Sequence, residues 1–132
     1  MGFSCECELR VRGGTAEERR SAADILLSAA YILEEGSGRS ESPDFLRLTF
    51  GTMDGLPEEE LELLWQQFPA LSLVLCYVSM DGEFFGMSSR DPEGAANESE
   101  DFDEGTREEI GRRFDGNALA FVRSRYSLDE DR

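Results

Sequence analysis

Alternation of apolar and polar residues with a period of two is the feature that most constrains what this chain can fold into. It is strict over residues 5–12 and is recognisable over residues 45–50, 71–78 and 84–88. Successive side chains of a β-strand point to opposite faces of its sheet, so each segment is predicted to be a strand. In residues 71–78 both alternating sets are largely apolar, which indicates a central strand covered on both faces. An Asp-Gly pair between the last two segments is typical of a β-hairpin turn.

Two helices are predicted between these strands, because apolar residues recur there every three or four positions. Thr15 and Glu18 match a capping box, which opens a predicted helix over residues 16–34. Pro57 is typical of a first helical turn, and the three glutamates that follow it favour the positive end of the helix dipole. This second helix is predicted to end at Pro69.

The remaining segments are predicted to be loops and a C-terminal helical region. Residues 36–43 are rich in Gly and Ser, as in a loop. Residues 91–105 hold seven acids and no base, which predicts a mobile, solvated loop. Thr106 begins a second capping-box match and with it a third helix. Residues 118–126 fit a helix or a strand, and we favour the helix; residues 127–132 are predicted to fray.

The length of the chain sets its domain organisation. A chain of 132 residues is the size of one domain and buries enough surface for a core without disulfides or metals. We therefore expect residues 1–132 to form a single α+β domain. Its predicted architecture is a four-stranded, mainly antiparallel sheet with two helices on one face and a C-terminal helix in addition.

The amino-acid composition excludes several kinds of catalytic site. The chain has no His, and all 13 of its basic residues are Arg. Triads, dyads and zinc sites that contain His are therefore excluded, as are lysine Schiff bases. Acids are abundant, but no pair of them stands out as a general acid and base. We predict no catalytic residue, no metal site and no cofactor, and hence a protein that is not an enzyme.

Three cysteines, Cys5, Cys7 and Cys76, are predicted to be reduced core residues rather than ligands of a soft metal. Their number is odd, and the N-terminus lacks the basic and apolar lead of a secretory signal. The longest apolar stretch, residues 71–78, is too short to cross a bilayer. We therefore expect a cytoplasmic protein with no membrane contact.

The net charge of −16 favours a basic partner and argues against direct contact with nucleic acid. The excess lies in residues 51–105, which hold 14 acids and one arginine. General solubility is the alternative explanation of this charge. Two groups of acids are candidates for contact with a basic protein surface: Glu58, Glu59 and Glu60, and Glu98, Glu100, Asp101, Asp103 and Glu104.

One face of the predicted sheet is a second candidate surface. If one alternating set of residues 71–78 packs on the helices, the other set points away from them. It would then share a face with apolar residues of the last strand: Val74, Cys76, Val78, Phe85 and Met87. An exposed apolar patch of this kind favours a homodimer or a larger homo-oligomer. The alternative is that the C-terminal helix covers this face.

Several motifs resemble those of the YubB-like proteins, a family encoded by plasmids and phages. They are Met1–Val11, Phe50–Asp54, Trp65–Pro69, the apolar alternation of residues 71–77, and Phe84–Gly86. The resemblance covers about half of the chain and implies a ferredoxin-like two-layer sandwich, but no activity. Together these observations predict a small acidic interaction protein, encoded by a mobile element, that blocks a basic nucleic-acid-binding surface of another protein. A homo-oligomeric accessory protein is the alternative.

Overall fold

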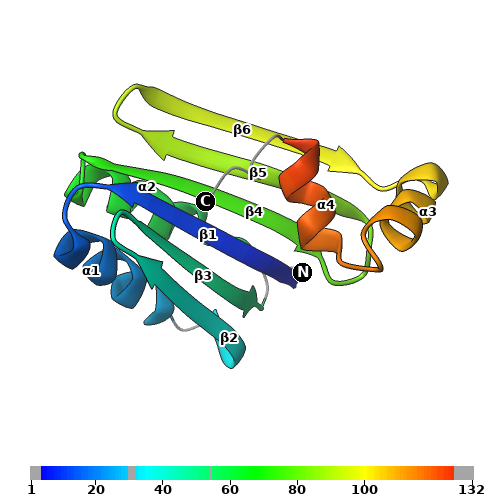
Figure 1. Ribbon diagram of the computed structural model, residues 1–132, viewed down its shortest axis with the longest axis horizontal. Helices are drawn as coiled ribbons and strands as arrows, with labels where there is room; N and C mark the ends of the chain where they lie inside the picture. The colour runs from blue at the N-terminus through cyan, green and yellow to red at the C-terminus, as the bar shows by residue number, and fades with distance from the viewer. Residues whose placement is uncertain (1–3, 30–31, 54, 127–132) are drawn as a thin grey trace.

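The computed structural model describes residues 4–29, 32–53 and 55–126, with the backbone only of residues 34–37 (Figure 1). The described residues form four helices and one antiparallel sheet of six strands, in the order β2-β3-β1-β4-β5-β6. The predicted α+β class is confirmed, but the sheet has six strands instead of the predicted four. In chain order the elements are β1 Cys5–Gly13, α1 Ala16–Leu27, β2 Ile32–Ser42, β3 Phe45–Thr52, α2 Glu58–Gln67, β4 Leu71–Ser79, β5 Phe84–Asp91, β6 Gly94–Asp101, α3 Glu104–Arg113 and α4 Ala118–Arg125.

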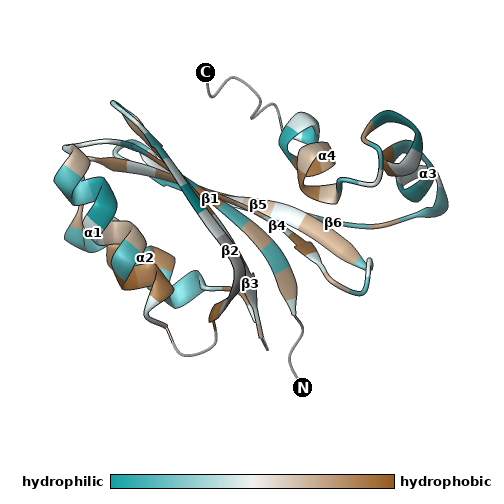
Figure 2. Ribbon diagram, turned by 60° about the horizontal axis from the view of Figure 1, so that its bottom comes forward, coloured by the Kyte–Doolittle hydropathy of each residue, from teal (hydrophilic) through white to brown (hydrophobic). Residues whose placement is uncertain are grey.

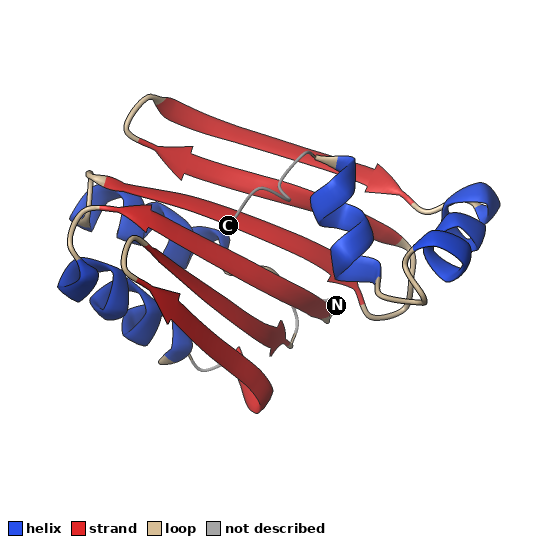
Figure 3. Cartoon of the chain, viewed as in Figure 1, coloured by secondary structure: helices blue, strands red, loops and turns tan. Residues whose placement is uncertain are grey.

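The helices divide between the two sides of the sheet. Both α1 and α2 lie on one side, and α3 and α4 lie on the other (Figure 2). β1 and β2 are connected through α1 and separated in the sheet by β3, whereas β3 and β4 are connected through α2 and separated by β1. Each of these helices thus crosses one intervening antiparallel strand. β5 and β6 extend the sheet beyond β4 through two hairpins, as Figure 3 shows for the strands in red.

The main core lies between the sheet and the layer of α1 and α2. The predicted capping box of α1 is present, since the Glu18 N–H donates to Thr15 Oγ1 at 3.0 Å and the Thr15 N–H donates to Glu18 Oε1 at 2.9 Å. The apolar residues of β1 and the residues of α1 and α2 that face the sheet are fully buried: Cys5, Cys7, Leu9 and Val11 of β1, Ala22, Ala23 and Leu26 of α1, and Leu61 and Leu64 of α2.

A second apolar cluster lies between the sheet and α4. Here the rings of Phe85 and Phe121 meet edge to face, with centroids 5.3 Å apart. Side chains of β4 and β5 pack on those of α3 and α4: Cys76, Val78, Phe85, Ile110, Leu119, Phe121 and Val122. β4 is therefore covered on both faces, as its two apolar sets predict.

The helix predicted over residues 16–34 is shorter than its apolar spacing suggests. α1 ends at Leu27, and the Ser28 N–H donates to Asp24 O at 3.2 Å while the Ser28 hydroxyl donates to Ile25 O at 2.7 Å. A hydroxyl that bonds to the backbone competes with continuation of the helix. Residues 30 and 31 of the predicted helix lie outside the described residues.

The loop predicted over residues 36–43 is wrong, because most of this segment belongs to β2. β2 pairs with β3 and shifts register between Leu33 and Gly38. It is the edge strand of the sheet on this side, its residues 38–42 are exposed, and its glycine-containing sequence shows no apolar alternation. An edge strand rich in Gly and Ser has the same sequence pattern as a loop, so the sequence alone does not distinguish the two.

The mobile loop predicted over residues 91–105 is also wrong. A tight turn precedes β6, in which the Asp91 carboxylate accepts the N–H groups of Glu93 at 2.8 Å and Gly94 at 3.1 Å. Gly94 has a φ of 151°, which favours glycine. β6 then pairs with β5 along its length and forms the second edge of the sheet. Charged side chains are typical of such edges because they oppose pairing with other chains.

The C-terminal region is helical, as predicted for residues 118–126, but α3 is capped differently from the prediction. Its N-cap is Asp103, whose carboxylate accepts the Thr106 N–H at 2.7 Å, so Thr106 lies inside the helix. Asn117 caps α4 in the same way through the Ala120 N–H. Residues 127–132, predicted to fray, lie outside the described residues.

Helix length and composition bear on the membrane prediction. Within the described part of the chain, no helix combines the length and the apolar character needed to cross a membrane.

Candidate acidic interaction surface

Three exposed carboxylates follow one another at the β6 side of the sheet. Glu98 and Asp101 belong to β6, and Glu104 begins α3. None of the three forms an ion pair with another described residue. β6 is last in the strand order, so one side of its backbone has no strand partner within the described chain. We call Glu98, Asp101 and Glu104 the acidic edge.

Its sequence position predicts that Glu100 belongs to this surface, but its carboxylate forms contacts within the molecule. Its oxygen atoms accept hydrogen bonds from Arg125 Nη2 at 2.7 Å and from the Tyr126 hydroxyl at 3.0 Å. The hydrogen bond from Arg125 lowers the pKa of Glu100, while burial and the bond to Glu100 raise the pKa of Tyr126. This carboxylate holds the end of α4 against β6.

Asp103 likewise has a structural role, because it caps α3. The backbone N–H of Thr106 lowers the pKa of the Asp103 carboxyl by bonding to its charged form. Two of the five acids predicted around β6 therefore hold the fold, and the other three are exposed without such a contact to another described residue.

The glutamates of α2 lie in its first turn, as predicted from Pro57. Glu58 and Glu59 are exposed and Glu60 is half-buried. Glu58 also lines a polar pocket of about 280 Å³ together with Tyr77 and residues of β5 and β6. The structure thus brings the start of α2 to the inner side of β6, where the two predicted acidic groups approach each other.

The floor of this polar pocket is rigid. The Tyr77 hydroxyl donates to Glu98 O at 3.3 Å, and burial, with a smaller contribution from Glu58, raises the pKa of Tyr77 to about 12. Arg90 Nε lies 2.5 Å from Glu62 Oε1, and Arg90 Nη1 donates to Asn97 Oδ1 at 3.0 Å. Arg90 therefore forms its contacts within the molecule.

The predicted apolar interface is covered by α4. Cys76, Val78 and Phe85 are at most 4% exposed, and Val74 and Met87 are partly buried against the same cluster. The helix closes the face that a second copy of the chain would need, so the structure presents no open apolar sheet here. Of the two alternatives for this face, coverage by the C-terminal helix is the observed one.

The three cysteines lie on two different faces of the sheet. Cys5 and Cys7 belong to the cluster under α1 and α2, and Cys76 belongs to the cluster under α4. Burial raises the pKa of Cys5 to about 12 and raises that of Cys7 well above its usual range. Thiols in this state are poor nucleophiles and ligands. In the described ranges, no group of three or more acids and cysteines is arranged to hold a metal ion.

An ion-pair cluster at Glu8 was not predicted from the sequence. Glu8 is 1% exposed, and its oxygen atoms lie 2.8 Å from Arg123 Nη1, 3.1 Å from Arg47 Nε and 3.8 Å from Arg10 Nε. The alternation of β1 predicts that its polar side, which includes Glu8, faces solvent. In the structure, α4 covers this side at Glu8. Only the contact between α4 and β1, which are far apart in the chain, makes Glu8 a buried residue.

No family model, curated protein or solved structure matches this chain. The resemblance to YubB-like proteins therefore stays a prediction.

Proposed function

We propose that the chain is a non-enzymatic protein that uses its acidic edge to bind and block a basic, nucleic-acid-binding surface of another protein. The observation that carries the proposal is the exposure of the Glu98, Asp101 and Glu104 carboxylates on the outermost strand and the helix that follows it. Glu98 and Asp101 point to opposite faces of the sheet, so the negative charge lies on both sides of this edge. Carboxylates spaced along one edge present negative charge to a partner much as a phosphate backbone does.

The distribution of arginines supports this proposal. Arg10 is buried, Arg90 and Arg123 bond to Glu62 and Glu8, and Arg125 bonds to Glu100. These cations are used to hold the fold, and none of them forms an ion pair with Glu98, Asp101 or Glu104. A protein of net charge −16 then concentrates its field where the carboxylates are exposed.

The shape of this side of the molecule also supports contact with cationic side chains. A pocket of about 420 Å³ lies between β6, α3 and α4. Its lining includes Asp101 and Asp103, together with Arg113 and Arg125, which pair with Glu109 and Glu100. An arginine or lysine of a partner would find both a concave surface and opposite charge there.

The proposal also includes a ferredoxin-like topology and membership of the YubB-like family. The order β2-β3-β1-β4, with α1 and α2 on one side, supports a ferredoxin-like unit to which β5, β6, α3 and α4 are added. A YubB-like, mobile-element origin and a cytoplasmic location rest on the sequence motifs alone.

A capture experiment with paired variants tests the proposal. The edge variant is Glu98→Gln with Asp101→Asn, and the control variant is Glu17→Gln with Asp44→Asn, which removes the same charges from exposed positions on α1 and the β2–β3 turn. Glu104 stays unchanged because an acid in the first turn favours α3. Each full-length chain is immobilised and exposed to lysate of the source cells at low and high salt.

We expect the native chain and the control variant to retain the same basic, nucleic-acid-binding protein at low salt, and the edge variant to lose it. The captured protein should no longer bind nucleic acid while the native chain is present. Equal retention by both variants, or retention that is indifferent to salt, would contradict the proposal.

A further inference from the structure

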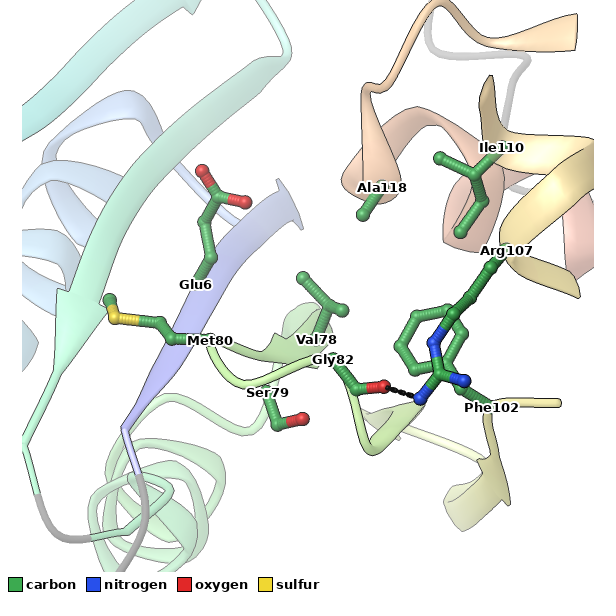
Figure 4. Close-up of a pocket in the computed structure, with 9 residues that line it drawn as sticks. All are labelled: Glu6, Val78, Ser79, Met80, Gly82, Phe102, Arg107, Ile110 and Ala118. Atoms are coloured by element: carbon green, nitrogen blue, oxygen red, sulfur yellow. Dashed lines mark hydrogen bonds between the residues drawn. The ribbon is translucent and has the colours of Figure 1, made fainter. Parts of the chain in front are cut away.

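A pocket of about 490 Å³ opens at the end of the sheet where β4 turns into β5, below the start of α4 (Figure 4). Its apolar walls come from four parts of the chain: Val78 and Met80, Phe102, Ile110 and Ala118. The volume lies within the range of small-molecule sites, which are mostly apolar with a few placed polar groups. This pocket is separate from the acidic edge.

Met80 gives the pocket an adaptable wall. Its side chain is 55% exposed, although its backbone N–H is fixed by a hydrogen bond to Ser4 O at 2.9 Å. A large apolar side chain left in water gains from contact with an apolar ligand. Methionine is flexible and polarizable, so it can close over ligands of different shape.

Glu6 provides the negative charge of the site. Its exposed carboxylate stands on β1 across the opening from Ala118 and Ile110 (Figure 4). It forms no hydrogen bond or ion pair with another residue of the described chain. Asp81 and Glu83, in the adjacent β4–β5 turn, are exposed acids as well. Exposed carboxylates therefore lie on and beside the Glu6 side of the opening, where they favour a cation.

Arg107 lies on the opposite wall, and its guanidinium is directed toward Gly82 and Phe102 and away from Glu6 (Figure 4). Its Nη2 donates to Gly82 O at 2.8 Å, and its guanidinium lies 6.0 Å from the Phe102 ring centroid. Its positive charge also lowers the pKa of Asp103, so it is shared with that carboxylate. Arg107 thus forms part of the wall, and Glu6 is left as the group that a ligand would meet.

We propose that this pocket binds a small organic amine. The apolar body of the amine packs between Val78, Met80 and Ile110, and its protonated nitrogen donates hydrogen bonds to the Glu6 carboxylate. The apolar contacts supply most of the affinity, and the charge-assisted hydrogen bond selects amines over neutral or anionic molecules of the same shape.

Three matched probes test this proposal: phenethylamine, phenethyl alcohol and 3-phenylpropionate. Binding to the full chain is measured by calorimetry and by shifts of the backbone amide signals in NMR spectra. We expect the amine to bind about threefold to tenfold more tightly than the alcohol, and the anion to bind most weakly. The largest shifts should fall on Ser79–Gly82 and on Ala118.

Glu6→Gln is expected to remove the preference for the amine while leaving binding of the alcohol unchanged, and Glu17→Gln serves as the control. Ala118→Met fills the pocket and should weaken all three probes, with folding checked by thermal unfolding. Lack of binding by all probes, equal binding of the anion, or an amine preference that survives Glu6→Gln would overturn the proposal.

Discussion

Glu8 connects the first strand to the last helix through a single carboxylate. Arg123 of α4 donates a hydrogen bond to this buried carboxylate, and Arg47 of β3 forms an ion pair with it. Removing one member of a buried ion cluster is strongly destabilising, because the charges that remain are left without compensation in a low-dielectric region. The cluster therefore adds a charged contact with β1 to the apolar packing that holds α4 on the sheet.

Glu8→Gln tests this dependence. We expect the free energy of unfolding to fall by about 3 kcal/mol, since the substitution keeps the shape and removes the charge. The control is Glu41→Gln, which breaks an exposed pair with Arg20 at 2.9 Å and should cost less than about 1 kcal/mol. Urea unfolding measures both. Equal losses in the two variants would show that the Glu8 cluster is not a buried one.

Leu64 and Trp65 are neighbours on α2 with different burial. Leu64 is fully buried, whereas Trp65 is partly exposed and its Nε1 donates to Asp91 O at 2.9 Å. We expect Leu64→Ala to lower the free energy of unfolding by about 3 to 4 kcal/mol and Trp65→Ala by about 2 kcal/mol. Trp65→Phe, which removes mainly the hydrogen bond, should cost about 1 kcal/mol. A Trp65→Ala loss larger than that of Leu64→Ala would contradict this order.

At the scale of elements, sequence patterns predicted the strands that pack on helices and missed the two exposed edge strands. β1, β3, β4 and β5 all carry apolar alternation, because at least one face of each packs on a helix layer. β2 and β6 are the two edges of the sheet, and their exposed residues are under no pressure to alternate. The turn at Asp91–Gly94 was the available signal for β6, since an Asp carboxylate followed by glycine favours a tight turn.

The contact of α4 with β6 is predicted to weaken in acid. Glu100 has a lowered pKa in the folded chain because Arg125 bonds to its charged form. The bonded carboxylate therefore stabilises the folded state above the unfolded pKa of about 4.3, and this stabilisation is lost as the pH falls through the lower folded value.

Glu100→Gln tests the acid dependence of this contact. The stability difference between the native chain and Glu100→Gln should be full at neutral pH and shrink below about pH 4. Urea midpoints at several pH values measure it, with Glu17→Gln as the control. A difference that stays constant from neutral pH into this acidic range would contradict the assignment.

At the scale of the whole molecule, the proposed function depends on which carboxylates form contacts within the fold and which face water. The sequence alone indicates a charge excess in residues 51–105, but it cannot tell a carboxylate that holds a helix from one that faces water. Glu100 and Asp103 are of the first kind, and Glu98 and Asp101 are of the second. That distinction depends on Arg125 and Thr106, whose positions follow from the packing of α3 and α4 on the sheet.

The most direct test of the central claim is the rate at which the chain associates with the basic protein that it captures. Stopped-flow measurements at low and high salt compare the native chain, the edge variant and the control variant. If the acidic edge steers association, the edge variant should associate about tenfold more slowly at low salt, with a smaller change in its dissociation rate, and this difference should vanish at high salt. An association rate that the edge variant and the control variant share at low salt would contradict the claim.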